Sequence, residues 1–199
     1  MRKLLVSLVA MLIAAPSFAQ FSSGGFELDK ESLYYGVRIG MTSASIGGDA
    51  SVGAKVGMTL AGVIGLRLSD STPVFIESGL YYTQRGAKEE GINVTHNNLE
   101  LPLLIKYGFK VSDNIALLPF FGPYFAYAVA SNVKYSENLE ASLPRLNRNN
   151  MGFKLGCGAE YNKLYLELGY QFAVTNILDT DTNLSAHNNA FFANFGVNF

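Results

Sequence analysis

Several features that would place the chain in a familiar class are scarce or missing from its 199 residues. It has no Trp and a single Cys, and its 15 Lys and Arg residues nearly balance its 16 Asp and Glu residues. One Cys excludes an intramolecular disulfide framework and a four-thiolate zinc site. A net charge near zero argues against nucleic-acid binding, which needs a basic surface. The 49% of hydrophobic residues is too high for a disordered chain.

Long apolar runs are also missing beyond the N-terminus. No stretch after residue 19 is apolar for 18 residues, so spanning helices are excluded. The closest candidate, Ala116–Ala130, contains Pro119, Gly122 and Pro123, which oppose a helix. If the protein enters a membrane, it must do so with strands.

The first 19 residues have the pattern of an export signal. Arg2 and Lys3 precede an apolar segment of 12 residues at 4–15, which is too short for a spanning helix of about 20 residues. Ser17-Phe18-Ala19 then matches the small-x-small motif of signal peptidase. We therefore predict a signal peptide at 1–19 cleaved between Ala19 and Gln20, a flexible lead-in at 20–32 and one domain at 33–199.

The rest of the chain alternates between apolar and polar residues with the period of a β-strand. In Leu164–Val174, for example, the even-numbered residues are all large and apolar, whereas the odd-numbered ones include Glu167 and Gln171. This pattern predicts eight strands: Leu33–Thr42, Val52–Ser69, Pro73–Arg85, Asn98–Lys110, Asn114–Ala130, Asn150–Asn162, Leu164–Thr175 and Asn189–Phe199.

The connections between these strands alternate strictly between long and short. Four long polar connections are expected at Ser43–Ser51, Gly86–Asn97, Ser131–Asn149 and Asn176–Asn188, with tight turns between them. Outer-membrane barrels of bacteria have short periplasmic turns and longer outer loops. The fold class predicted is therefore all-β: an eight-stranded antiparallel transmembrane β-barrel that follows an N-terminal signal peptide.

The polar face of the strands carries charges of both signs at mid-strand, which a soluble barrel would direct outward. We expect these charges inside the barrel: Arg38, Lys55, Arg67, Glu77, Lys106, Lys154, Glu160 and Glu167. A buried ion needs a partner, so we expect at least one carboxylate–amine pair among Lys106, Lys154, Glu160 and Glu167. The apolar face would meet lipid, with outward aromatic residues in a ring near each end.

Prolines and the C-terminus add two further expectations. Pro102, Pro119 and Pro123 lie inside two neighbouring strands, and we expect bulges there because proline removes a ladder donor. The last strand ends with Phe195, Val197 and Phe199 on one face. This ending resembles the terminal aromatic signal by which outer-membrane barrels are recognised for assembly.

Several segments together resemble one family. Gly79-Leu80-Tyr81-Tyr82, Leu101-Pro102-Leu103-Leu104-Ile105-Lys106-Tyr107, Gly122-Pro123-Tyr124 and Gly156-Cys157-Gly158-Ala159-Glu160-Tyr161 are similar to the PorT-type family of outer-membrane β-barrel proteins. The resemblance implies an eight-stranded barrel in the outer membrane of a Gram-negative bacterium. It carries over no catalytic residue, and a few relatives serve a secretion system.

Catalytic and binding alternatives rest on few residues. His96 and His187 fall in expected loops, where Ser136 or Asp179 would have to complete a lipid-modifying acyl-transfer site, but the spacing shows no nucleophile–base–orienter trio. We predict no enzyme activity, no catalytic residue, no cofactor and no metal. The expected partners are outer-membrane lipid, the barrel-assembly machinery and an unidentified envelope protein, with no nucleic acid. A narrow pore, a lipid-modifying enzyme and a soluble lipocalin-type barrel remain as alternatives.

Overall fold

The computed structural model describes the chain apart from residues 1–32, 49–51, 70, 90–91, 136–147 and 176–185. The predicted signal peptide, its cleavage site at Ala19 and Gln20, and the lead-in lie outside the described residues. Within the described part, no helix is long and apolar enough to cross a membrane.

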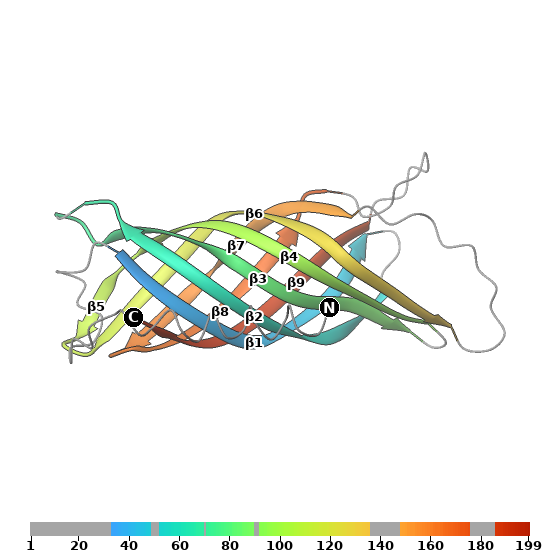
Figure 1. The fold of residues 1–199 in the computed structure, drawn as a ribbon, viewed down its shortest axis with the longest axis horizontal. Helices are drawn as coiled ribbons and strands as arrows, with labels where there is room; N and C mark the ends of the chain where they lie inside the picture. Colours follow the sequence, from blue (N-terminus) through green and yellow to red (C-terminus); the bar gives the residue numbers. More distant parts are fainter. Residues whose placement is uncertain (1–32, 49–51, 70, 90–91, 136–147, 176–185) are drawn as a thin grey trace, which may run out of the picture.

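The described chain forms a closed antiparallel β-barrel. Its strands are β1 (Leu33–Gly48), β2 (Val52–Arg67), β3 (Val74–Glu89), β4 (Ile92–Tyr107), β5 (Phe109–Ser112), β6 (Ile115–Tyr135), β7 (Asn149–Tyr161), β8 (Leu164–Ala173) and β9 (Ala186–Asn198). The order in the sheet is β4-β3-β2-β1-β9-β8-β7-β6-β5, and an additional pairing of β4 with β6 closes the barrel. The strands run obliquely to the long axis in Figure 1.

The short strand β5 is the continuation of β4, so the barrel has eight spanning strands, as predicted. Lys106 pairs with Phe120 and Phe109 pairs with Leu117, which is the same register against β6 on both sides of Gly108. At this break the Gly108 N–H donates to the carbonyl of Pro73 at 2.8 Å.

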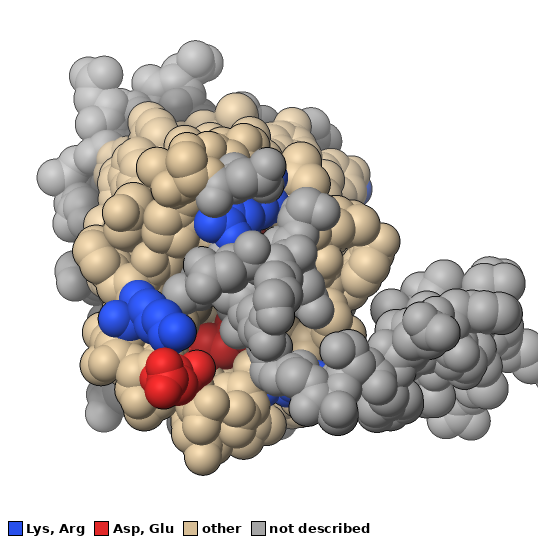
Figure 2. All heavy atoms as spheres, turned by 90° about the vertical axis from the view of Figure 1, so that its left-hand side faces the viewer, with Lys and Arg blue, Asp and Glu red and all other residues tan. Residues whose placement is uncertain are grey.

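Side chains divide cleanly between the two faces of the wall. Large apolar residues face outward, such as Met41 and Ile105 with 64% and 57% of their surface exposed, whereas Arg38 and Glu100 on the inner face are 1% and 0% exposed. An end-on view of the barrel shows uncharged residues around most of its rim (Figure 2). This arrangement is opposite to that of a soluble barrel and matches a wall that meets lipid.

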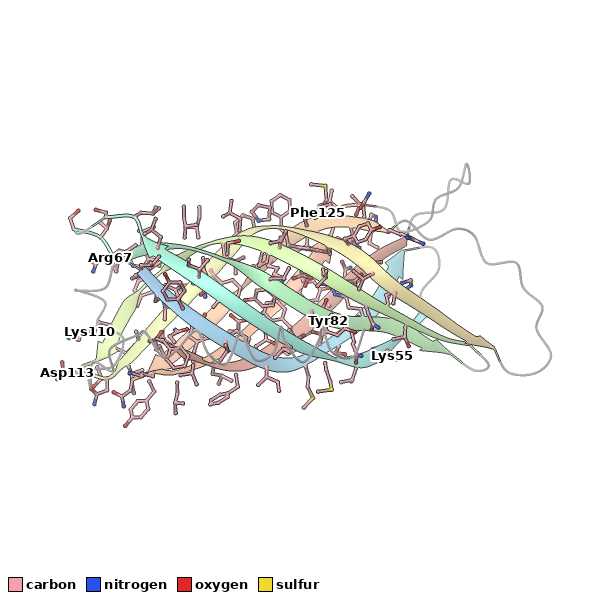
Figure 3. The ribbon with its side chains drawn as sticks, viewed as in Figure 1. Lys55, Arg67, Tyr82, Lys110, Asp113 and Phe125 are labelled. Atoms are coloured by element: carbon pink, nitrogen blue, oxygen red, sulfur yellow. The ribbon has the colours of Figure 1, made fainter. Side chains whose placement is uncertain are left out.

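Outward aromatic residues lie near both ends of the barrel. Tyr35, Tyr107, Phe109, Tyr161 and Phe199 are exposed near the tight turns, which form what we call the turn end. Tyr82 and Phe125 are exposed towards the opposite, loop end (Figure 3). Tyr127, two residues further along β6, and Phe191, near the start of β9, are exposed as well. Phe153 is half-buried and not fully exposed, because it stacks between Phe121 and Phe172, with ring centroids 5.5 and 5.7 Å away.

The strands at the loop end are longer than predicted. β1 continues to Gly48 and β2 begins at Val52, so most of the expected connection Ser43–Ser51 is strand. The same correction applies to Gly86–Asn97, because β3 ends at Glu89 and β4 begins at Ile92. Polar residues can pair in a ladder as well as apolar ones once a hairpin leaves the lipid, so polarity did not mark the ends of these strands.

The expected bulges at the prolines are not present. β6 and β7 keep one register through Pro119↔Cys157 and Pro123↔Phe153. The β3–β4 ladder is interrupted opposite Pro102 but resumes unchanged, from Tyr81↔Glu100 to Ser78↔Leu103. The Ser78 hydroxyl donates to the Pro102 carbonyl at 2.8 Å, which adds a side-chain bond across the interrupted part of the ladder.

Candidate functional site in the barrel interior

The interior of the barrel holds most of the charged residues that the alternation places on the inner face. Arg38, Glu77, Lys106, Lys154, Glu160 and Glu167 are all buried there. Lys55 and Arg67 are half-buried at opposite ends, Arg67 at the turn end and Lys55 towards the loop end (Figure 3). Two further buried charges, Arg85 and Glu100, belong to the same set.

The alternation of inward and outward positions along a strand was sufficient to find these two additional residues, because residues an even number apart lie on the same face. Arg85 has the same parity as Glu77 on β3, and Glu100 has the same parity as Lys106 on β4. Arg85 is the last residue of its predicted strand, whereas β3 continues past it to Glu89. The longer β3 moves it into the wall.

Glu77 is the centre of the cluster nearer the turn end, which we call the turn-side cluster (Arg38, Glu77, Lys106, Tyr34 and Tyr165). Lys106 Nζ lies 2.7 Å from Glu77 Oε1, and Arg38 Nη2 lies 3.6 Å from Glu77 Oε2. The Tyr34 hydroxyl donates to Glu77 Oε2 at 2.7 Å, and Lys106 Nζ donates to the Tyr165 hydroxyl at 2.8 Å. One carboxylate on β3 therefore binds cations from the adjacent strand β4 and from β1.

Arg38 extends this cluster to the last strands of the barrel. Its Nη2 donates to Asn198 Oδ1 at 2.6 Å, and Asn198 Nδ2 donates to Glu160 Oε2 at 2.8 Å. The guanidinium also lies 4.1 Å from the centroid of the Tyr165 ring. A Cβ at Gly196 would lie 2.2 Å from the Val37 carbonyl oxygen and 2.6 Å from Arg38 Cδ, so glycine is needed for the close approach of β9 to β1 beside the arginine.

Glu100 has the same role in a second cluster nearer the loop end, which we call the outer cluster (Arg85, Glu100, Lys154 and Gln171). Arg85 and Lys154 both form ion pairs with Glu100, and Gln171 Nε2 donates to Glu100 Oε2 at 3.2 Å. The Lys154 ammonium lies 4.6 Å from the ring centroid of Tyr81. The cluster joins β3, β4, β7 and β8.

Leu104, Phe120 and Phe192 form a buried apolar group that also fills the lumen. The remaining buried carboxylate, Glu167, accepts a bond from Asn194 Nδ2 at 2.6 Å. One oxygen of Glu167 and one of Glu160 accept no hydrogen bond from any described residue.

The ion pairs differ from the predicted ones. We expected a pair among Lys106, Lys154, Glu160 and Glu167, but within the described part of the chain neither lysine pairs with either of these glutamates. The lysines instead contact Glu77 and Glu100. Parity shows which residues point inward, but the stagger of the closed barrel decides which of them meet.

Among the fully buried residues that the structure describes, charges balance, with four cations and four carboxylates. Eight strands leave room inside for side chains and little more. Interlocked ion pairs, amides and aromatic rings fill that room here. The chemistry of the interior is that of a stable plug, and no nucleophile–base pair occurs among the described contacts.

The two histidines do not form a common site. His96 lies on β4 opposite Arg85 and Ser131, whereas His187 lies on β9 opposite Gly47. Ser136 and Asp179, the residues considered as their partners, lie outside the described residues. No group of three His, Cys, Asp or Glu side chains that would suit a metal ion occurs within the described ranges.

Comparisons with known proteins agree with this architecture. The family model described as outer membrane protein beta-barrel domain matches residues 18–179. The crystal structure of Neisserial surface protein A, from Neisseria, is similar with a TM-score of 0.51 and 14% identity, over 85% of this chain and 100% of that one. A major outer membrane protein from Thermus thermophilus has a TM-score of 0.50 and 15% identity, with the same coverage.

These structural similarities, at such low identity, show the fold alone. No curated protein matches the sequence. The narrower resemblance to the PorT-type family stays a prediction.

Proposed function

The chain belongs to the outer membrane protein beta-barrel domain family, and from this premise we propose a non-enzymatic integral barrel of a Gram-negative outer membrane. In this proposal the interior is sealed, and the protein acts through its surfaces. The outer wall contacts membrane lipid, and the barrel-assembly machinery recognises the last strand during biogenesis. The tight turns face the periplasm and the loop end faces outward.

One observation carries the proposal: two ionic clusters close the lumen at different heights. Glu77 and Glu100 each bind two cations that come from different strands. A solute would have to break several buried ion pairs to pass, and each broken pair leaves an uncompensated charge. Transport through the barrel is therefore disfavoured.

Surface interaction is the role that the shape of the barrel supports best, ahead of envelope structure and secretion support. β3, β4 and β6 extend well beyond the other strands at the loop end (Figure 1). Strands that project from the membrane offer backbone and side-chain groups to other molecules outside the cell.

Conductance and lipid analysis test this proposal together. The refolded protein in planar lipid bilayers is expected to give no discrete conductance steps under conditions in which a general porin does. Cells with and without the protein are expected to have the same lipid A and phospholipid species by mass spectrometry. Steps that disappear when Lys154 is neutralised would support the pore instead, and a lipid change lost in His96→Ala or His187→Ala would support the enzyme.

A further inference from the structure

β1 and β9 are the first and last strands of the barrel, and they lie side by side in its wall (Figure 1). Every other neighbouring pair in the sheet is formed by consecutive strands, since β5 is the continuation of β4. A hairpin turn fixes the register of the two strands that it joins. No turn joins β1 to β9, in which the bonded residues Arg38 and Asn198 are 160 residues apart in the sequence. The alignment of this pair therefore depends on the strands themselves.

On the inner face, three successive levels of the β1–β9 ladder pair a polar side chain with a glycine. The polar residue alternates between the two strands: Asn198 lies opposite Gly36, Arg38 opposite Gly196, and Asn194 opposite Gly40. Each polar side chain occupies space that a Cβ on the facing glycine would need. A Cβ at Gly36 would lie 2.6 Å from Asn198 Oδ1, and Asn194 Oδ1 is among the atoms nearest to a Cβ at Gly40. The two strands thus interlock, with a side chain of one over a glycine of the other.

The two asparagines also donate hydrogen bonds to carboxylates on other strands. Asn198 accepts a bond from Arg38 Nη2 at 2.6 Å and donates to Glu160 Oε2 of β7 at 2.8 Å. Asn194 donates to Glu167 Oε1 of β8 at 2.6 Å. All five side chains are buried. A displaced asparagine would leave a buried carboxylate oxygen without its donor, which is costly.

Shifted alignments of β9 on β1 lose this interlock. A shift by one residue turns the inward side chains of β9 towards lipid. A shift by two residues keeps the faces but, in one direction, places Asn198 opposite Arg38 and Gly196 opposite Gly40. In the other direction Asn194 lies opposite Arg38, and Gly196 again faces a glycine. Either way, two large side chains crowd one level while the next level has none, and both overpacking and voids destabilise an interior.

We propose that Arg38, Asn194 and Asn198 form a register lock, by which β9 recognises β1 in the one alignment that closes the barrel. The lock selects a strand that presents a cation between two glycines on its inner face. It is distinct from the proposed terminal aromatic signal, because Phe195 and Phe199 lie on the outer face of β9. It is also independent of the role of the closed barrel.

Disulfide formation between introduced cysteines reports the register. Cys157, the single cysteine of the chain, is first replaced by alanine. Ala193→Cys on β9 is then combined with Met41→Cys, its opposite position, or with Ile39→Cys or Ser43→Cys, which lie opposite it only after a two-residue shift. Opposite Cβ atoms are about 4.5–5.5 Å apart and diagonal positions about 7–8 Å, so oxidation with diamide joins the opposite pair selectively. After refolding in lipid vesicles, a chain with the intact lock is expected to form almost only the disulfide from position 41.

Asn198→Leu removes both hydrogen bonds of the amide at nearly constant volume. The disulfides of the shifted alignments are expected to increase at least fivefold as a share of the folded fraction, because the native alignment loses its bonds to Arg38 and Glu160. Asn98→Leu is the matched control, since Asn98 is a buried asparagine between the consecutive strands β3 and β4. An unchanged distribution in Asn198→Leu, or the same change in Asn98→Leu, would overturn the proposal.

Gly36 and Asn198 also allow a reciprocal test. The atoms nearest to a Cβ at Gly36 all belong to side chains, so a second substitution can make room for it. Gly36→Ala is expected to lower the yield of the disulfide between positions 41 and 193 at least threefold. Addition of Asn198→Gly is expected to raise that yield at least twofold, because the side chain opposite residue 36 is removed. A wild-type yield in Gly36→Ala, or no recovery in the double variant, would overturn the proposal, and this outcome decides it even if Asn198→Leu does not fold.

Discussion

Glu100 shows how much of the interior depends on single side chains. It is fully buried and contacts Arg85, Lys154 and Gln171 from three other strands. A buried charge that loses its partner stays uncompensated, so the contribution of such an ion pair to stability depends mainly on whether both partners remain.

Glu100→Gln is therefore expected to lower the free energy of unfolding by about 3–5 kcal/mol, because two buried cations lose their counter-charge. Lys110→Gln is the control, since Lys110 and Asp113 form an exposed pair at 3.4 Å and such pairs contribute less than about 1 kcal/mol. Urea unfolding in lipid vesicles, followed by tyrosine fluorescence, measures both. Equal effects of the two substitutions would contradict the claim that the buried ion pairs stabilise the interior of the barrel.

Leu168 tests the outer face at a single residue. It lies near the middle of β8 and is 48% exposed on the outer wall. Leu168→Arg is expected to cost about 2–4 kcal/mol near the bilayer midplane, whereas Val111→Arg at the turn end is expected to cost about 0–1 kcal/mol. A harmless Leu168→Arg in the same unfolding assay would show that this face does not meet lipid.

At the scale of the elements, one side-chain hydrogen bond spans the point at which the ladder between β3 and β4 is interrupted. Pro102 lacks the N–H that a central strand supplies, yet β3 and β4 keep their register on both sides of it. Ser78 lies on the neighbouring strand and donates to the Pro102 carbonyl. A side chain thus adds a bond where the backbone ladder is interrupted.

Ser78→Ala is expected to lower the free energy of unfolding by about 0.5–1.5 kcal/mol, the range of a single hydrogen bond. Ser78→Thr keeps the hydroxyl and is expected to stay close to wild type, since threonine also suits a strand. The same vesicle unfolding assay compares them. If both variants lost the same amount, the hydroxyl bond would not be the reason.

At the scale of the whole molecule, β9, the last strand, pairs with β1, the first. The Phe199 N–H donates to the Tyr35 carbonyl at 2.7 Å, and the Tyr35 N–H donates to the Phe199 carbonyl at 3.0 Å. Phe195 and Phe199 are exposed on the outer face and Val197 is half-buried. The pairing between β1 and β9, which we call the seam, and the proposed assembly signal therefore involve the same strand, β9.

Deletion of Phe199 separates these two roles. We expect the amount of heat-modifiable barrel in isolated outer membranes to fall severalfold, while refolding of the purified chain into detergent stays close to wild type. The reason is that one pair of backbone bonds is a small part of the seam between β1 and β9, which runs from Gly36↔Asn198 to Gly48↔Ala186. An equal loss in both assays would assign Phe199 to closure alone.

The division into an inner and an outer face was determined by the sequence by itself. The period of two is a property of the strand backbone and needs no knowledge of the partner strands. It correctly predicts eight antiparallel spanning strands and the tight turns between them. It also places Arg85 and Glu100 inside once their parity with Glu77 and Lys106 is followed.

Only the tertiary structure decided which of these residues meet and where the strands end. Lys154 reaches Glu100 from β7 to β4, strands that are not neighbours, so the contact depends on closure and stagger of the whole barrel. Where a strand ends beyond the lipid depends on how far its neighbouring strands continue to pair with it. Among the described residues, β6 pairs with β4 as far as Ile92↔Tyr135 and with β7 as far as Tyr127↔Asn149, a difference that the alternation of the sequence does not contain because it depends on how far each neighbouring strand continues.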